Sequence, residues 1–304
     1  MNYIPHYIKL HKTCELKKRV HLLNDILKNC KLCPRQCGVN RLNGEVGFCK
    51  AGEALMISSA LPHFGEEPPL VGNRGSGTIF LTHCNLKCIF CQNYDISHQG
   101  HGEIISSEQL AEYIHSLQKR GCHNINFVTP THYLPQILAA LPYAIDLGLN
   151  IPLVYNCGGY EALEAIHLLD GIIVIYMPDV KFSRKEVAEK YTQAPDYPEV
   201  VKKALKEMHR QVGDLQINAE GIAERGLLIR HLVMPNGLAG SRELMHFIAT
   251  EISPYSYVNV MGQYRPEYKA SDYPELSRGI THQEYIEAIA SAKDEGLDRG
   301  FSQI

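Results

Sequence analysis

Short apolar runs alternate with amphipathic stretches along most of this chain, and this alternation limits the folds that it can adopt. The runs have the length and the β-branched and aromatic content of buried strands. They lie at residues 78–81, 124–128, 151–155, 172–176, 226–233 and 257–261. A stretch with helical periodicity follows each run, at residues 107–119, 133–147, 159–168, 198–212, 241–250 and 282–295. Repeated units of this kind indicate a parallel sheet with right-handed crossovers.

Six such units predict an α/β fold, a partial (open) TIM-like (β/α)6 barrel, because a closed barrel of this type has eight. The chain has 304 residues, of which 45% are hydrophobic, and this suffices for one large domain and a small appendage. We expect an N-terminal helix and a four-cysteine segment at residues 1–52 and a Gly- and Pro-rich connector at residues 53–75. The core domain then occupies residues 76–304.

Three cysteines, Cys84, Cys88 and Cys91, follow the first predicted strand within eight residues. Thiolates bind iron–sulfur clusters and soft metals, and full ligation of a cubane cluster normally takes four of them. A set of three leaves one iron without a protein ligand, as a cluster that binds a substrate requires. The alternative is a zinc site completed by His83 or His98, although zinc sites favour two separated cysteine pairs.

A second group of four cysteines follows a predicted helix over residues 16–27. Its members are Cys30, Cys33, Cys37 and Cys49, with two, three and eleven residues between them. Four thiolates at this spacing fit a tetrahedral zinc site or a closed [4Fe–4S] site, and thiols that pack without metal are the third interpretation. A closed site has no position for a substrate, so we expect this one to serve structure or electron relay.

The stretch CNLKCIFC, with the aromatic Phe90 just before its third cysteine, resembles the radical S-adenosylmethionine (radical SAM) superfamily. The flanking sequences, GSGTIF before it and QNYDIS after it, are similar to those of the branch related to pyruvate formate-lyase activating enzymes. Within that branch the chain looks like homologues that begin with a CPRQCGVNR-type cysteine segment. The resemblance runs from about Cys30 to the last predicted helix, and it implies the same open barrel.

The resemblance implies a radical enzyme in which the cofactors carry the chemistry. The triplet would hold a [4Fe–4S] cluster whose open iron chelates SAM. One-electron reduction, with a flavodoxin or ferredoxin as donor, would cleave SAM to methionine and a 5′-deoxyadenosyl radical that abstracts hydrogen. The substrate implied is a glycine in a partner protein, with a small molecule or another peptide as the alternatives. No protein acid or base is required for the first step.

Polar residues follow the carboxyl ends of all six predicted strands, where parallel α/β folds place their active sites. Beyond the cysteine loop they include residues 129–132, 156–159, 179–181, 230–236 and 263–265. Their convergence on one rim predicts a site there. Glu66 and Glu67, in the connector, are expected to be solvated loop carboxylates, with a role at the site as the alternative. Cys157 is expected to be a packed thiol at the rim.

The resemblance also implies contacts to SAM, made by Phe90, Asn156, Asp179, Lys181, Arg230 and Gln263. Lys181 would pair with the carboxylate of SAM and Asp179 with its ammonium group, and Arg230 aligns with an arginine of the family. The chain departs from the family at two places. VTPTH replaces the Gly-Gly-Glu that binds the amino group of SAM, and Asn156 replaces the first aspartate of Asp-Thr-Asn-Gly.

The composition argues against several other classes of function. The net charge is −3 and no long basic run occurs, so a dedicated nucleic-acid binder is not expected. The longest apolar runs are too short to cross a bilayer, and the N-terminus lacks the apolar core of a signal peptide. Ten cysteines in an unexported chain indicate metal ligands rather than disulfides, so we expect a cytoplasmic protein with no membrane partner.

Two rival functions stay open at this point. One is a non-catalytic iron–sulfur protein that uses two clusters for electron transfer or as a scaffold. The other is a regulatory protein with zinc at both cysteine groups. Formation of 5′-deoxyadenosine from added SAM by the reduced, reconstituted protein separates the enzyme from both.

Overall fold

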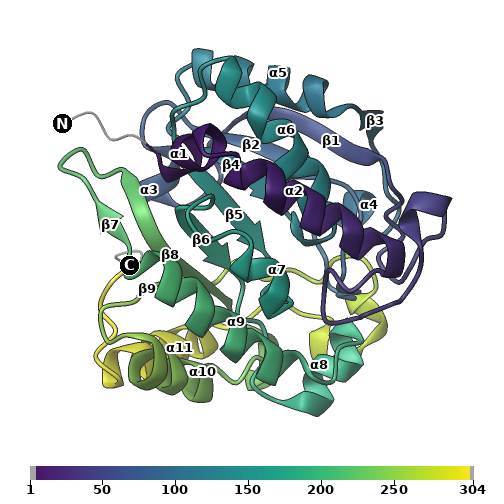
Figure 1. Cartoon of the computed structure of the whole chain (residues 1–304). Helices are drawn as coiled ribbons and strands as arrows, with labels where there is room; N and C mark the ends of the chain where they lie inside the picture. The colour runs from purple at the N-terminus through teal and green to yellow at the C-terminus, as the bar shows by residue number, and fades with distance from the viewer. Residues whose placement is uncertain (1–4, 302–304) are drawn as a thin grey trace.

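The computed structural model describes residues 5–301 of the chain. Its strands form one open sheet that curves into a partial barrel, with helices on its outer side (Figure 1). Six strands run parallel in the spatial order β2 (Ser76–Leu81), β4 (Ile125–Val128), β5 (Leu153–Cys157), β6 (Ile175–Pro178), β8 (Ala223–Leu232) and β9 (Tyr257–Met261). The predicted open (β/α)6 architecture is therefore confirmed.

The sheet is not parallel throughout, and this part of the prediction is wrong. Strands β1 (Leu55–His63), β3 (Glu103–Ile105) and β7 (Gln216–Ile217) are antiparallel additions. β1 pairs along β2 and lies inside the segment predicted as a connector, so residues 55–63 belong to the core sheet. Its sequence, LMISSALPH, mixes apolar residues with two serines and a proline, and therefore lacks the apolar run of a buried strand.

The predicted helices are present with shifts of a few residues at their ends. The helices are α1 (His6–Lys12), α2 (Glu15–Ile26), α3 (Pro68–Val71), α4 (Tyr94–Ser97), α5 (Ser107–Lys119), α6 (Leu134–Asp146), α7 (Leu163–His167), α8 (Lys185–Thr192), α9 (Tyr197–Val212), α10 (Ser241–Phe247) and α11 (His282–Asp294). A capping box at Ser106 and Gln109 sets the start of α5. Helices α1, α3, α4 and α8 were not predicted. Within the described residues, no helix is long and apolar enough to span a membrane.

Side chains alternate between the two faces of the strands, and the two faces differ in character. Outward residues such as Phe127, Tyr155 and Ile229 are fully or almost fully buried in the main hydrophobic core beneath the helices. The inward side combines a small apolar cluster, which includes Val154 and Leu228, with polar residues. Because side chains have a period of two along a strand, the inward row of each strand carries the polar groups toward the barrel interior.

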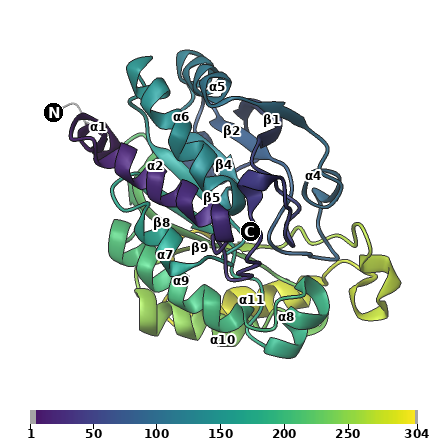
Figure 2. The same cartoon turned by 45° about the vertical axis from the view of Figure 1, so that its right-hand side comes forward.

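The N-terminal helices lie across the outside of the barrel, where α2 packs against α6 (Figures 1 and 2). Beyond α2 the four-cysteine segment, residues 30–49, turns back toward the loop that follows β2. It makes hydrogen bonds to that loop and to the end of α8. The two cysteine groups therefore belong to one structural unit.

Candidate functional site

The loop after β2 presents the three thiols of Cys84, Cys88 and Cys91. Cys88 is buried, and the other two are half-buried. The backbone N–H of Leu86 donates to Cys84 Sγ at 3.3 Å, and Ser97 Oγ lies 3.1 Å from Cys91 Sγ. Burial raises the pKa of Cys84 to about 11, and a metal bound to the sulfur would favour the thiolate. The loop thus supplies three soft ligands and an N–H group directed at sulfur.

Backbone hydrogen bonds hold this loop on both sides. On one side it is fixed to the end of α8, where Lys87 N donates to Thr192 O at 3.2 Å and Ile89 N donates to Tyr191 O at 3.0 Å. On the other side, Lys269 N donates to Ile89 O at 2.9 Å. The loop is therefore fixed by segments far away in the sequence, as a geometrically demanding ligand set requires.

The two histidines of the zinc alternative differ in their contacts. His98 Nε2 lies 3.0 Å from the carbonyl oxygen of Cys88, and its ring stacks on Tyr268 with centroids 4.7 Å apart. These contacts make His98 a support of the loop. His83 has a left-handed backbone with φ of 66°, and burial lowers the pKa of its imidazole.

A cavity of about 230 Å³ adjoins the thiols of Cys88 and Cys91. The residues that line it come from the cysteine loop and from the carboxyl ends of β6, β8 and β9: Cys88, Phe90, Cys91, Gln92, Asn93, Asp179, Lys181, Arg230, Leu232, Met261 and Gln263. Five of the six residues predicted to contact SAM lie in this lining. The sixth, Asn156, lies behind Arg230 and accepts a 2.7 Å hydrogen bond from its Nη2.

Asp179 forms hydrogen-bonded ion pairs with two cations in the lining of this cavity. Lys181 Nζ donates to Asp179 Oδ2 at 2.6 Å, and Arg230 Nε donates to Asp179 Oδ1 at 2.8 Å. Burial alone would raise the pKa of Asp179, but Arg230 and Lys181 together hold it below its usual value. Burial alone would lower the pKa of Lys181. The nearby Asp179 and Cys88 have the larger opposite effect, so the pKa of Lys181 is raised. All three groups are therefore charged at neutral pH.

Glu66 and Glu67 are not solvated loop carboxylates, and this prediction is wrong. Their side chains are only 7% and 4% exposed, and each lies close to Arg230, with nitrogen–oxygen distances of 3.6 and 3.8 Å. Asn259 Nδ2 also donates to Glu67 Oε1 at 3.1 Å. The cause is β1, because its pairing with β2 folds the following segment into the barrel. Burial raises the pKa of Glu66 to about 7.

The polar residues after β4 do not reach the cavity, so the predicted convergence is incomplete. Thr131 Oγ1 donates to Glu161 Oε1 at 2.8 Å, where Tyr155 also donates to the other carboxylate oxygen. His132 Nε2 lies 2.8 Å from the Thr82 carbonyl oxygen, and the ring is buried. Thr129, at the start of this turn, has a left-handed backbone with φ of 60°. Cys157 is buried and packed in the core, as expected.

The four cysteines of the N-terminal segment come together. Cys30, Cys33, Cys37 and Cys49 line one small enclosed cavity of about 10 Å³, with His132 and Arg41 also in its wall. All four thiols are free. The described part of the chain contains no three His, Cys, Asp or Glu side chains placed to hold a single metal ion.

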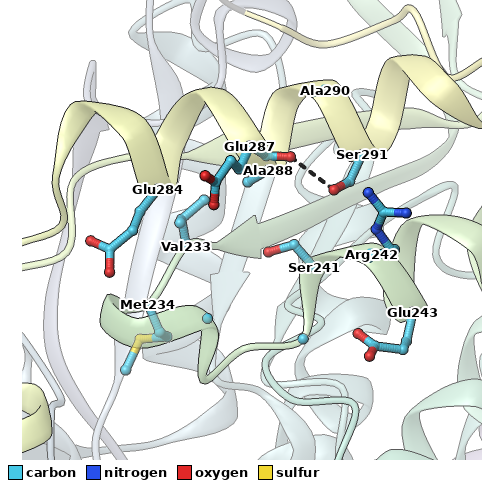
Figure 3. A pocket seen from close by; sticks show the side chains of 12 residues that line it. Val233, Met234, Ser241, Arg242, Glu243, Glu284, Glu287, Ala288, Ala290 and Ser291 are labelled. Atoms are coloured by element: carbon cyan, nitrogen blue, oxygen red, sulfur yellow. Dashed lines mark hydrogen bonds between the residues drawn. The ribbon is translucent and has the colours of Figure 1, made fainter.

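Another cavity, of about 340 Å³, lies between α10 and α11 (Figure 3). Ser241, Arg242 and Glu243 line it from one side, and Glu284, Glu287 and Ser291 line it from the other. Ser241 Oγ forms a 2.8 Å hydrogen bond with Nε2 of the buried His231. No cysteine lines this cavity. The candidate site is therefore the 230 Å³ cavity, because it combines thiols with charged side chains of both signs.

Comparisons with known proteins place the chain in a family. Residues 78–219 match the model of the radical SAM superfamily. The chain is 36% identical to the uncharacterized protein MJ0674 of Methanocaldococcus jannaschii over 292 residues, which are 93% of this chain and 80% of that protein. It is 24% identical to MJ0808 of the same organism, over 93% of this chain and 81% of that protein.

Among solved structures, the fold is similar to that of Streptococcus suis SuiB bound to S-adenosylmethionine, with a TM-score of 0.50 and 12% identity. The similarity covers 73% of this chain and 48% of SuiB, so this chain spans about half the length of that protein. At this identity the likeness concerns the fold alone. The family match, which includes the cysteine loop after β2, leads to one assignment: the chain belongs to the radical SAM superfamily.

Proposed function

We propose that this protein holds a [4Fe–4S] cluster on Cys84, Cys88 and Cys91 and reductively cleaves SAM in the cavity beside it. One observation carries the proposal: two of the three thiols line the same 230 Å³ cavity as Asp179, Lys181 and Arg230. Thiols that suit a soft metal and charged groups of both signs thus line one cavity. The similar SuiB structure was solved with SAM bound, which supports this ligand.

The loop suits a cluster with one open iron. Three thiols from eight residues ligate three corners of a cubane, and the N–H of Leu86 stabilises the sulfur of Cys84. Phe90 packs edge-on against Phe182, with ring centroids 5.9 Å apart, and is itself buried. When bound, such a cluster supplies the electron for reductive cleavage of SAM to methionine and a 5′-deoxyadenosyl radical.

The charged residues of the cavity, Asp179, Lys181 and Arg230, suit the amino-acid end of SAM. Asp179 offers a carboxylate to the ammonium group, and Lys181 offers a cation to the carboxylate. Arg230 is held by Asp179, Asn156 and the two buried glutamates, so its position is fixed from several sides. Within residues 5–301, Lys181 Nζ pairs with Asp179, and its other two N–H donors can serve a ligand. Leu232 and Met261 add an apolar surface for the nucleoside.

For the substrate we propose a glycine of a partner protein, with a flavodoxin or ferredoxin as electron donor. The sequence resemblance to pyruvate formate-lyase activating enzymes and the open edge of the barrel support a polypeptide substrate. A small molecule is the alternative, and hydrogen transfer distinguishes the two. Protein fractions and small-molecule fractions are prepared from cells fed deuterated glycine and incubated with the reduced enzyme and SAM. Deuterium in 5′-deoxyadenosine from the protein fraction alone supports the proposal, and deuterium from the small-molecule fraction alone overturns it.

The cleavage itself is tested without any substrate. Protein reconstituted with iron and sulfide under anaerobic conditions is reduced with dithionite and mixed with SAM, and 5′-deoxyadenosine is measured by mass spectrometry. We expect it to accumulate with time. A non-catalytic electron carrier would hold the clusters and leave SAM intact, and that result would overturn the proposal.

A further inference from the structure

We propose that Cys30, Cys33, Cys37 and Cys49 hold a second [4Fe–4S] cluster, with Arg41 as its counter-charge and Arg35 as its link to the loop of the first cluster. The inference concerns a different part of the chain from the SAM cavity. It does not depend on SAM cleavage, because its tests count metal and sulfide.

The four-cysteine segment is folded around its sulfurs. Cys30 and Val39 are joined by a 2.9 Å backbone hydrogen bond, and the N–H of Phe48 donates to Cys37 Sγ at 3.4 Å. A Cβ on Gly47 would lie 2.8 Å from the same sulfur, so only glycine allows this close approach. Backbone N–H groups directed at sulfur are typical of iron–sulfur sites.

Arg41 provides an independent observation that points to an anion. It is 1% exposed, and its guanidinium donates to the carbonyl oxygens of Gly52 and His132. Among residues 5–301, no carboxylate lies within ion-pair distance of it. A buried cation is costly unless a negative charge compensates it. Arg41 lines the cavity of the four thiols, and four thiolates on a divalent metal or on an oxidised cubane cluster carry a net charge of about −2.

Four thiolates can hold either a zinc ion or a cubane cluster. We choose the cluster because the segment directs a backbone N–H group and a close glycine at Cys37 Sγ, and because it is hydrogen-bonded to the loop of the first cluster. Zinc at this group is the outcome that overturns the proposal.

Arg35 lies between Cys33 and Cys37 and connects the two cysteine groups. Its Nε donates to the carbonyl oxygen of Asn85 at 3.1 Å, one residue from Cys84. Its Nη2 donates at 3.2 Å to Thr192 O, the carbonyl that also accepts from the cysteine loop at Lys87. Its guanidinium carbon lies 3.8 Å from the ring centroid of Phe48, next to Cys49 in sequence. Ligation of the second cluster therefore positions the residue that holds the loop of the first.

The test measures iron, sulfide and zinc in the full chain reconstituted without SAM. Wild-type protein is expected to contain about eight iron per chain, and the variant with Cys84, Cys88 and Cys91 all changed to Ala about four. The Cys33→Ala, Cys49→Ala variant is also expected to keep about four. Cys122→Ala, which removes a buried thiol outside both groups, should keep all eight and serves as the matched control.

Electron paramagnetic resonance of the reduced variants separates the two centres. The cluster left in the triple variant should give a signal that SAM does not change, because a closed site has no open iron. A triple variant that contains about one zinc and no iron per chain, or no metal at all, would overturn the proposal. A Cys33→Ala, Cys49→Ala variant with the iron content of wild type would also overturn it, so the test does not rest on the folding of one variant.

Discussion

Lys181 and Asp179 form a 2.6 Å ion pair whose two members line the cavity of Cys88. They are separated by one residue after β6, and their side chains are 16% and 19% exposed. Opposite charges fixed side by side at this depth match the ammonium and carboxylate groups of a free amino acid. Folding thus orders the pair before a ligand arrives, which lowers the entropy cost of binding.

Replacing Lys181 or Asp179 by Ala is expected to weaken SAM binding by about 10- to 100-fold, or roughly 1.4–2.8 kcal/mol, because each removes a charge-assisted contact. Titration of the reconstituted protein with SAM, followed by the cluster signal, measures the affinity. Lys190→Ala is the matched control, since it breaks an exposed ion pair with Glu275 outside the cavity. Unchanged affinity in both cavity variants would show that β6 does not carry the contact.

Glu66 gives the fold a dependence on pH. Burial raises its pKa from 4.5 to about 7, so the fold favours the protonated form. This contribution to stability is fully present below pH 4.5 and is lost as the pH rises through about 7. Its total size is about 3 kcal/mol. Glu66→Gln should therefore lose less stability between pH 5 and pH 8 than wild type does.

Urea denaturation at the two pH values measures this difference. The free energy of unfolding of the variant should still fall somewhat with pH, because burial raises the pKa of Glu161 to about 7 as well. Glu164→Gln, at an exposed position of α7, is the control and should keep the wild-type slope. If Glu66→Gln also kept the full slope, Glu66 would be ionised in the fold throughout this range.

Removal of the Arg35 side chain should loosen the loop of the first cluster. Arg35→Gln loses hydrogen bonds to Asn85 and to the end of α8, and we expect the first cluster to be lost to a chelator several-fold faster. The rate of iron release from the SAM-responsive centre, read by its spectrum, checks this. Arg184→Gln removes an exposed arginine at the start of α8 and should release iron at the wild-type rate. Equal rates in the two variants would contradict the link.

Much of the fold could be predicted from the sequence because its signals are local. Apolar runs mark the buried strands, and the capping box of Ser106 and Gln109 marks the start of α5. β1 escaped prediction because it pairs on one side of β2 and needs no continuous apolar run. α8 escaped because its sequence, KEVAEKYT, contains few apolar residues.

The site likewise contains features with a local sequence signal and features that depend on long-range contacts. Cysteine spacing is a local signal, and both thiol groups were found from it. The burial of Glu66 and Glu67 depends on how the unpredicted β1 folds the next segment into the barrel, so no local pattern reveals it. Likewise, His132 lines the four-cysteine cavity although it lies about 80 residues beyond the last of these cysteines in the sequence. Such placements follow from long-range pairing and turn geometry.

The formation of 5′-deoxyadenosine by reduced wild-type protein and by Cys88→Ala tests the central claim most directly. Cys88 is chosen because it is the buried thiol of the triplet and lines the charged cavity. Cys122→Ala is the control for loss of a buried cysteine. We predict product from wild type and control and none from Cys88→Ala, because the first cluster loses a ligand that water replaces poorly on a soft metal. Cleavage of SAM by Cys88→Ala at the wild-type rate would contradict the account.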